Sequence, residues 1–154
     1  MSDLCEFFLT IALLPSQHSP RTPFTIAITA QSPTISVGSE VWIKVSITNR
    51  SNTSLDDSGG FTYDGIDPNL QFDVRDGDGK SVPKRKVQHR ELTAGQAVNR
   101  SIPAGQTFTQ DQRVSAIYDM SKPGKYLIQV SRRASDNPKD GEIRSKPITV
   151  IVVP

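Results

Sequence analysis

Side chains that could carry acid–base chemistry are few, because the 154-residue chain holds two histidines, His18 and His89, and one cysteine. A catalytic triad needs a histidine that moves a proton between fixed partners. His18 lies in a proline-rich segment that cannot hold an imidazole ring in place, and His89 lies among cations that oppose its protonation. We therefore expect no catalytic residue in this chain and no enzyme activity.

Motifs for cofactors and structural metals are also missing from the sequence. It has no Gly-x-Ser-x-Gly nucleophile elbow, no phosphate-binding Gly-x-x-x-x-Gly-Lys loop and no dinucleotide-binding Gly-x-Gly-x-x-Gly. One cysteine and two histidines cannot form a zinc site of the four-cysteine or two-cysteine, two-histidine kind. We expect the protein to use no cofactor.

Three carboxylates, at Asp73, Asp76 and Asp78, are weak calcium candidates, because Ca²⁺ favours clustered oxygen ligands. No glutamate follows at the spacing of an EF-hand loop. Two consecutive Asp-Gly pairs, at residues 76–79, are also typical of a tight hairpin turn, since these residues tolerate positive φ. A plain hairpin is the preferred interpretation, and a calcium site is the alternative.

Candidate partner-binding residues lie in residues 51–69, nineteen positions rich in Ser, Asn, Asp and Gly. We expect an irregular loop here, and loops of this length in a compact domain are often functional. Phe61 and Tyr63 supply the aromatic groups that interface cores use, and Asp64 and Asp67 add charge beside them. These four residues are predicted to contact a protein partner, and binding of an ion by the loop carboxylates is the alternative.

Basic residues cluster at positions 84–90 and at Arg132 and Arg133, although the net charge is only +2. Surfaces that bind single-stranded nucleic acid combine such charge with stacking aromatics, and aromatics are 6% of this chain. Charge on an edge strand discourages aggregation between sheets and explains the clusters equally well. We expect solvated charge and no nucleic-acid partner.

Residues 1–23 are predicted to be an N-terminal apolar segment followed by a proline-rich linker. The apolar run, residues 7–14, is far shorter than the roughly 20 residues of a membrane helix. Asp3 and Glu6 precede it where a secretory signal would carry basic residues. We expect no membrane span, and the chain is either cytoplasmic or exported with a degenerate signal.

The rest of the chain, residues 24–154, shows short apolar segments that alternate with polar residues every second position. Turn-forming Gly, Pro, Asn and Asp separate these segments, and no amphipathic helix is long enough to cover a sheet. Without helical crossovers, two antiparallel sheets packed face to face are the economical solution. We expect one all-β domain, an antiparallel β-sandwich of about seven to nine strands, with a helical turn in residues 115–120.

Residues 119–128 resemble the corner before the F strand of immunoglobulin-like domains. Gly124 and Tyr126 match the Gly-x-Tyr of that corner, in which the tyrosine hydroxyl bonds to upstream backbone. The cysteine pair of antibody domains is missing. The resemblance therefore implies a general immunoglobulin-like sandwich.

Residues 41–130 are also similar to the bacterial intracellular proteinase-inhibitor family and to the non-catalytic sandwich of deuterolysin-type lysine-specific metalloendopeptidases. No His-Glu-x-x-His occurs in the chain, so the likeness to the peptidases stops before catalysis. The resemblance implies a module that binds or scaffolds. The matching segments, in order, are Thr48-Asn49, Phe72-Asp73-Val74, Pro103-Ala104-Gly105-Gln106 and Gly124-x-Tyr126.

The sequence thus favours a non-catalytic immunoglobulin-like binding or accessory domain that recognises a protein partner through loops at one end of the sandwich. We expect a monomer or a weak oligomer. The alternative is a proteinase inhibitor of the intracellular type, with an exposed loop in an enzyme's cleft. Tight inhibition favours a preorganised loop, and the Gly59-Gly60 pair argues against such stiffness.

Overall fold

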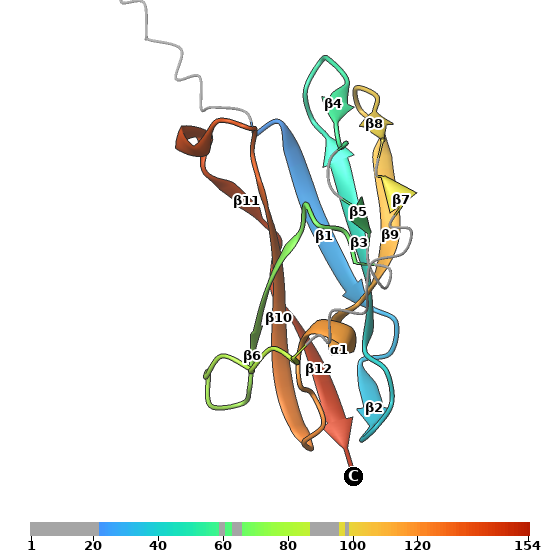
Figure 1. The fold of residues 1–154 in the computed structure, drawn as a ribbon, viewed down its shortest axis with the longest axis vertical. Coiled ribbons are helices and arrows are strands. Elements are labelled where there is room, and N and C mark those ends of the chain that lie inside the picture. The colour runs from blue at the N-terminus through green and yellow to red at the C-terminus, as the bar shows by residue number, and fades with distance from the viewer. Residues whose placement is uncertain (1–21, 59–60, 63–65, 87–95, 98) are drawn as a thin grey trace, which may run out of the picture.

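The computed structural model describes residues 22–58, 61–62, 66–86, 96–97 and 99–154. Strands make up about half of this part of the chain and form two facing layers (Figure 1). The predicted N-terminal segment and linker lie almost wholly outside it and stay predictions. The strands are β1 (Phe24–Ala30), β2 (Thr34–Ser36), β3 (Trp42–Asn49), β4 (Leu55–Asp56), β5 (Phe61–Thr62), β6 (Gln71–Arg75), β7 (Gln96–Ala97), β8 (Ser101–Ile102), β9 (Thr107–Arg113), β10 (Gly124–Arg133), β11 (Glu142–Arg144) and β12 (Ile148–Val153).

The first layer is the antiparallel sheet β1-β3-β9. Its central strand, β3, pairs with β1 from Ile43 to Asn49 and with β9 from Trp42 to Thr48. Alternate β3 residues are buried, as the two-residue period predicts for a strand with one face on a core. The predicted strands in this region are confirmed.

The second layer is built around β10, the longest strand. One edge of β10 pairs with β6, and the other pairs with β12 and then with β11, all antiparallel. The short strand β2 completes the layer beside β12. Ten residues of β10 therefore hold together segments that lie more than fifty positions apart in the sequence, such as Phe72 and Val130.

The order of pairing is that of an immunoglobulin-like sandwich. The strands β1, β3 and β9 correspond to A, B and E of that fold, and β6, β10 and β12 correspond to C, F and G. The predicted tyrosine corner is also present, since the Tyr126 hydroxyl donates to the Lys122 carbonyl at 2.8 Å. The predicted class, an all-β immunoglobulin-like β-sandwich, is confirmed.

One pair of strands departs from the expected antiparallel pattern. The strands β2 and β12 run parallel, with Ile35 opposite Val152. The chain leaves the first layer after β1, turns at Ser32 and Pro33, and enters the second layer as β2. Because β1 and β2 are successive in sequence but belong to different layers, one short strand can lie beside the last strand in the same direction.

The core lies between the layers and is mostly aliphatic. The inward positions of β1, β3, β10 and β12 supply most of it, and the short helix α1 (Val114–Ile117) closes one side with the fully buried Val114. This helix confirms the helical turn predicted in residues 115–120. No helix in the described ranges is long and apolar enough to cross a membrane. The inward strand residues are Phe24, Ile26, Ile28, Ile43, Val45, Ile47, Tyr126, Ile128, Val130, Val150 and Val152.

The prediction that residues 51–69 form an irregular loop is wrong in part. Within them, β4 pairs with β8 and β5 pairs with β7, each through two residues. The chain turns after β3 at a corner fixed by the fully buried Asn49, whose side-chain nitrogen donates to the carbonyls of Thr53 and Ile102 at 2.8 Å. Four of the twelve strands are two residues long, which leaves eight longer ones, within the predicted number.

Candidate functional site

A cluster of buried charges lies at the end of the sandwich that carries β4 and β8. Two carboxylates, Asp57 and Asp67, contact two guanidinium groups, Arg100 and Arg132. We call these four residues the charge cluster. Asp57 follows β4, Asp67 precedes β6, Arg100 precedes β8 and Arg132 is near the end of β10. Four separate segments therefore meet at one point.

Asp57 is the centre of the charge cluster, and its side chain is fully buried. Arg100 donates to one carboxylate oxygen and Arg132 donates to the other. Arg132 also donates to the Asp56 carbonyl at 3.1 Å, and the Asp57 amide donates to the Arg100 carbonyl at 2.8 Å. Backbone and side chain of Asp57 are thus both held.

Asp67 is buried as well, with 1% of its surface exposed. Its Oδ2 accepts hydrogen bonds from Arg100 Nη2 at 2.9 Å and from Gln110 Nε2 at 2.6 Å. The Asp67 amide donates to Gln112 Oε1 at 2.9 Å, and Oδ1 accepts from the Asn69 amide at 2.9 Å. Two inward glutamines of β9 therefore connect the charge cluster to the first layer.

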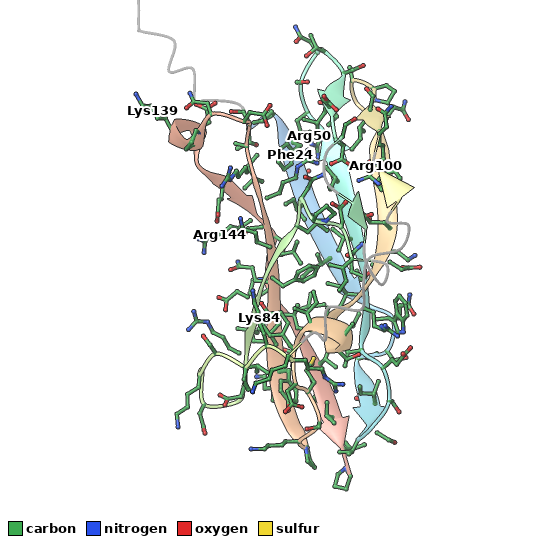
Figure 2. All side chains as sticks on the ribbon, in the orientation of Figure 1. Phe24, Arg50, Lys84, Arg100, Lys139 and Arg144 are labelled. Atoms are coloured by element: carbon green, nitrogen blue, oxygen red, sulfur yellow. The ribbon has the colours of Figure 1, made fainter. Side chains whose placement is uncertain are left out.

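Each guanidinium group of the charge cluster also lies over an aromatic ring. The Arg100 carbon Cζ lies 3.7 Å from the centre of the Phe108 ring, and that of Arg132 lies 5.3 Å from the centre of the Phe24 ring. Figure 2 shows Phe24 and Arg100 near each other in the upper part of the sandwich. A cation over a desolvated ring gains attraction that an exposed ion pair lacks, so the rings help to fix the two arginines.

The buried carboxylates of the charge cluster are stabilised by the two guanidinium groups that pair with them. Burial raises the pKa of Asp57, and the neighbouring Arg132 and Arg100 act against that rise. Two carboxylates and two guanidinium groups have no net charge together, so the cluster can stay buried only as a set. Removing one member of a buried ion pair leaves its partner uncompensated, which is strongly destabilising. The charge cluster therefore holds both ends of the segment between Asp57 and Asp67 in place.

A polar groove lies directly beside the charge cluster. Its volume is about 480 Å³. It lies between residues in and just after β4 on one side and the end of β10 with the segment after it on the other. Arg132 belongs to both the charge cluster and the groove. The residues lining the groove are Leu55, Asp56, Ser58, Pro68, Asn69, Gln71, Arg132, Arg133, Ala134, Ser135 and Asp136.

The predicted partner-binding residues are placed as follows. Asp67 is buried in the charge cluster, where its carboxylate accepts hydrogen bonds from Arg100 and Gln110. Phe61 is in β5, and its backbone pairs with that of Ala97 in β7. Tyr63 and Asp64 lie outside the described residues. Contact of these residues with a partner stays a prediction.

Two of the three weak calcium candidates, Asp73 and Asp76, accept hydrogen bonds from nearby residues of the chain. Asp73 accepts a hydrogen bond from Arg75 Nε at 3.1 Å. Asp76 accepts from the backbone amides of Asp78 and Lys80 at 3.0 and 2.9 Å, which closes the predicted hairpin turn. In the part of the chain that the structure describes, no three His, Cys, Asp or Glu side chains gather as a metal site.

The expectation that Arg132 and Arg133 are both solvated is wrong for Arg132, and the charge cluster was therefore not predicted. Arg132 is 8% exposed and faces inward, whereas Arg133 faces out. The signal was present in the sequence, since Tyr126, Ile128 and Val130 alternate and Arg132 continues the same inward series. No comparable signal identified Asp57 or Arg100.

Fold and site together define a domain of the immunoglobulin-like sandwich class with a charge cluster under one end. No protein-family model matches the chain, and no curated protein matches it. The resemblance to the proteinase-inhibitor family and to the deuterolysin-type sandwich therefore stays a prediction.

Among solved structures, the chain is similar to the CARDB domain of a Pyrococcus furiosus protein, studied in solution. The two are 12% identical over 85% of this chain and 94% of that one, with a TM-score of 0.44. A crystal structure of that CARDB domain with di-metal ions is 12% identical over 84% of this chain and 87% of that one, with a TM-score of 0.45. The Pseudomonas fluorescens alkylpurine DNA glycosylase AlkC, bound to DNA with an abasic site analog, is 11% identical over 86% of this chain and 31% of that one, with a TM-score of 0.47.

Proposed function

We propose that this chain is a non-catalytic binding module that recognises a protein partner through the 51–69 loop and the polar groove beside it. The observation that carries the proposal is the charge cluster, which ties Asp57 and Asp67, on either side of residues 58–66, to both layers. Segments presented by a rigid scaffold are where such folds place recognition.

Rigid attachment at both ends matters for affinity. A binding segment loses conformational freedom when it associates, and a scaffold that already fixes its ends reduces that loss. The buried ion pairs of the charge cluster connect β10 in the second layer with Asp57, and Gln110 and Gln112 connect β9 in the first layer with Asp67. The segment between them therefore starts and finishes at fixed points.

The polar groove extends the same surface and gives a partner a second point of contact. Its exposed carboxylate Asp56 accepts hydrogen bonds from Ser58, which hold the pKa of this carboxyl below its ordinary value. Asp136 lies on the other side of the groove, in the segment after β10. Polar rims of this kind surround the apolar centre of protein interfaces, a centre that Phe61 and Tyr63 would supply.

The experiment compares three forms of the protein as immobilised bait. They are the wild type, a double variant Phe61→Ala with Tyr63→Ala, and the matched control Leu127→Ala, whose side chain is 38% exposed on the outer face of the other layer. We expect a protein bound by the wild type and by the control to be lost from the double variant, with the same melting temperature in all three. Equal retention by the double variant would remove the loop from the interface.

A proteinase panel separates binding from inhibition. Titrating the domain into serine and metallo proteinases is expected to leave their activity unchanged at micromolar concentration. Saturable inhibition that disappears in the double variant would instead establish the inhibitor alternative. A large drop in the melting temperature of the double variant would place Phe61 and Tyr63 in the core.

A further inference from the structure

A second groove lies toward the other end of the sandwich, near α1 and β2 in Figure 1. Its volume is about 470 Å³. We call it the basic groove, because it contains three cationic side chains and one carboxylate. The residues lining it are Gly38, Ser39, Glu40, Arg85, Lys86, Arg113, Ser115, Ala116, Met120 and Ser121.

The cations of the basic groove come from two separate parts of the chain. Arg113 ends β9, where it is opposite Trp42 of β3. Arg85 and Lys86 belong to the run after the hairpin, and the Arg85 amide donates to the Ile117 carbonyl of α1 at 2.7 Å. Lys84 forms a bridge with Tyr118 next to this bond. Backbone bonds therefore hold the basic run against α1.

Cationic side chains outnumber carboxylates three to one among the residues lining the basic groove. Arg113 Nη1 donates to Glu40 Oε1 at 2.7 Å, but the buried Nε of Arg113 has no hydrogen-bond partner in the described part of the chain. The Ser115 hydroxyl oxygen accepts from the Val41 amide at 3.0 Å, and a hydroxyl that accepts can still donate its proton. Arg85 and Lys86 form no ion pair with any described residue. Buried donors in native structures are rarely without a partner, and each exception needs an explanation.

We propose that the basic groove binds an acidic peptide segment of a protein partner, with peptide carboxylates bound by Arg85, Lys86 and Arg113. Glu40 shows the pairing, because its carboxylate already contacts Arg113 as a peptide carboxylate would. The same negative charge opposes a phosphate dianion more strongly than a carboxylate monoanion.

This proposal goes beyond the function proposed for the 51–69 loop, because it concerns a different surface. In Figure 2, Lys84, next to the basic groove, lies well below Arg100 of the charge cluster. The chain would then hold two contact sites, one at each end of the sandwich. Binding at one site can be measured without the other.

The test is a titration of the whole chain with a hexaglutamate peptide, followed by the emission of Trp42. This is the only tryptophan, and its ring centre is 5.9 Å from the Arg113 guanidinium. In the double variant Arg85→Gln with Lys86→Gln, we expect the dissociation constant to rise about tenfold or more, since two charge-assisted contacts are lost. The matched control, Lys139→Gln with Arg144→Gln, removes the same charge from β11 and the segment before it, which lie above Lys84 in Figure 2, and is expected to change the dissociation constant by less than about twofold.

A further variant tests the guanidinium itself. Arg113→Lys keeps the positive charge but removes the planar guanidinium that can bind a carboxylate through two hydrogen bonds, so it is expected to weaken hexaglutamate binding while leaving the melting temperature close to that of the wild type. Unchanged binding by Arg113→Lys would contradict the geometry proposed here. Equal weakening in both double variants, or no saturable binding by the wild type, would overturn the site. Displacement of hexaglutamate by inorganic phosphate at a lower concentration would overturn the assignment to carboxylate.

Discussion

The Arg132 guanidinium contacts the buried carboxylate of Asp57, a residue 75 positions earlier in the chain. This ion pair connects the C-terminal end of β10 with the segment after β4, and the Arg132 guanidinium lies over the Phe24 ring. Neither charge reaches bulk water to any large extent, since Asp57 is fully buried and Arg132 is 8% exposed. The contact therefore links stability of the sandwich to the position of the proposed binding loop.

Replacing Arg132 with Met tests that link. The substitution keeps much of the side-chain volume but leaves Asp57 buried without one of its cations, so we expect the free energy of unfolding to fall by about 3–5 kcal/mol. The matched control is Arg133→Met, one residue along on the exposed face, which is expected to change it by less than about 0.5 kcal/mol. Urea denaturation of both variants measures the difference, and equal effects would contradict the role given to the charge cluster.

The tyrosine corner gives a second prediction. Tyr126→Phe removes the hydroxyl that donates to the Lys122 carbonyl, so the free energy of unfolding is expected to fall by about 1 kcal/mol. Because the acceptor is backbone, Lys122→Ala should leave this bond intact and stability nearly unchanged. Chemical denaturation of the two variants checks the pair. A larger loss in Lys122→Ala than in Tyr126→Phe would show that the corner depends on the lysine side chain instead.

The corner at Asn49 is a third case. Its side chain donates to two carbonyls and accepts from the Ser51 amide at 2.9 Å, all next to a fully buried position. Asn49→Ala leaves these groups without partners, and each unsatisfied buried group costs about 1–3 kcal/mol. We expect a loss of at least about 2 kcal/mol by urea denaturation, against less than about 0.5 kcal/mol for the exposed control Asn52→Ala. Similar stabilities would mean that water replaces the lost bonds.

The hairpin after β6 provides a matched pair of glycines. Gly79 has φ of +78°, a left-handed conformation, whereas Gly77 does not have positive φ. A side chain in the left-handed region costs about 1–2 kcal/mol, so Gly79→Ala is expected to destabilise the domain by that amount. A Cβ at Gly77 would meet only ordinary contacts, the nearest at 3.8 Å, so Gly77→Ala should be close to neutral. Thermal denaturation distinguishes them, and equal melting temperatures would show that the turn relaxes.

Acid should affect the local structure at Glu40. The hydrogen bond from the Trp42 indole, followed by that from Arg113, holds the pKa of Glu40 below its ordinary value. A lowered pKa in the folded state means that the stabilisation is present above the ordinary glutamate range and is lost as the pH falls through the folded-state pKa. Trp42 emission is therefore expected to change below the usual range for glutamate. Glu40→Gln should abolish this transition, and its persistence in that variant would assign it to another group.

Much of the sandwich follows from local alternation. The inward series of β3, ending Val45, Ile47 and Asn49, and that of β10, ending Ile128, Val130 and Arg132, can both be read from the sequence, because strand side chains point to opposite faces in turn. The polar residues that end these two series are the ones that tie the corner and the charge cluster. The same alternation places Asn49 and Arg132 on the inward face, whereas Arg132 was expected to be solvated, and it does not identify what either residue contacts.

The longer strands, the tyrosine corner and the hairpin turn can be predicted from the sequence, since each depends on residues close together in the chain. The ion pairs of the charge cluster could not be predicted, because they depend on the tertiary fold. The same holds for the formation of β4 and β5 within residues 51–69. These contacts join residues 33 to 75 positions apart. Their formation depends on which strands pair and in which register. The two-residue alternation does not specify either, because it fits any partner strand and any register shift of two residues equally well.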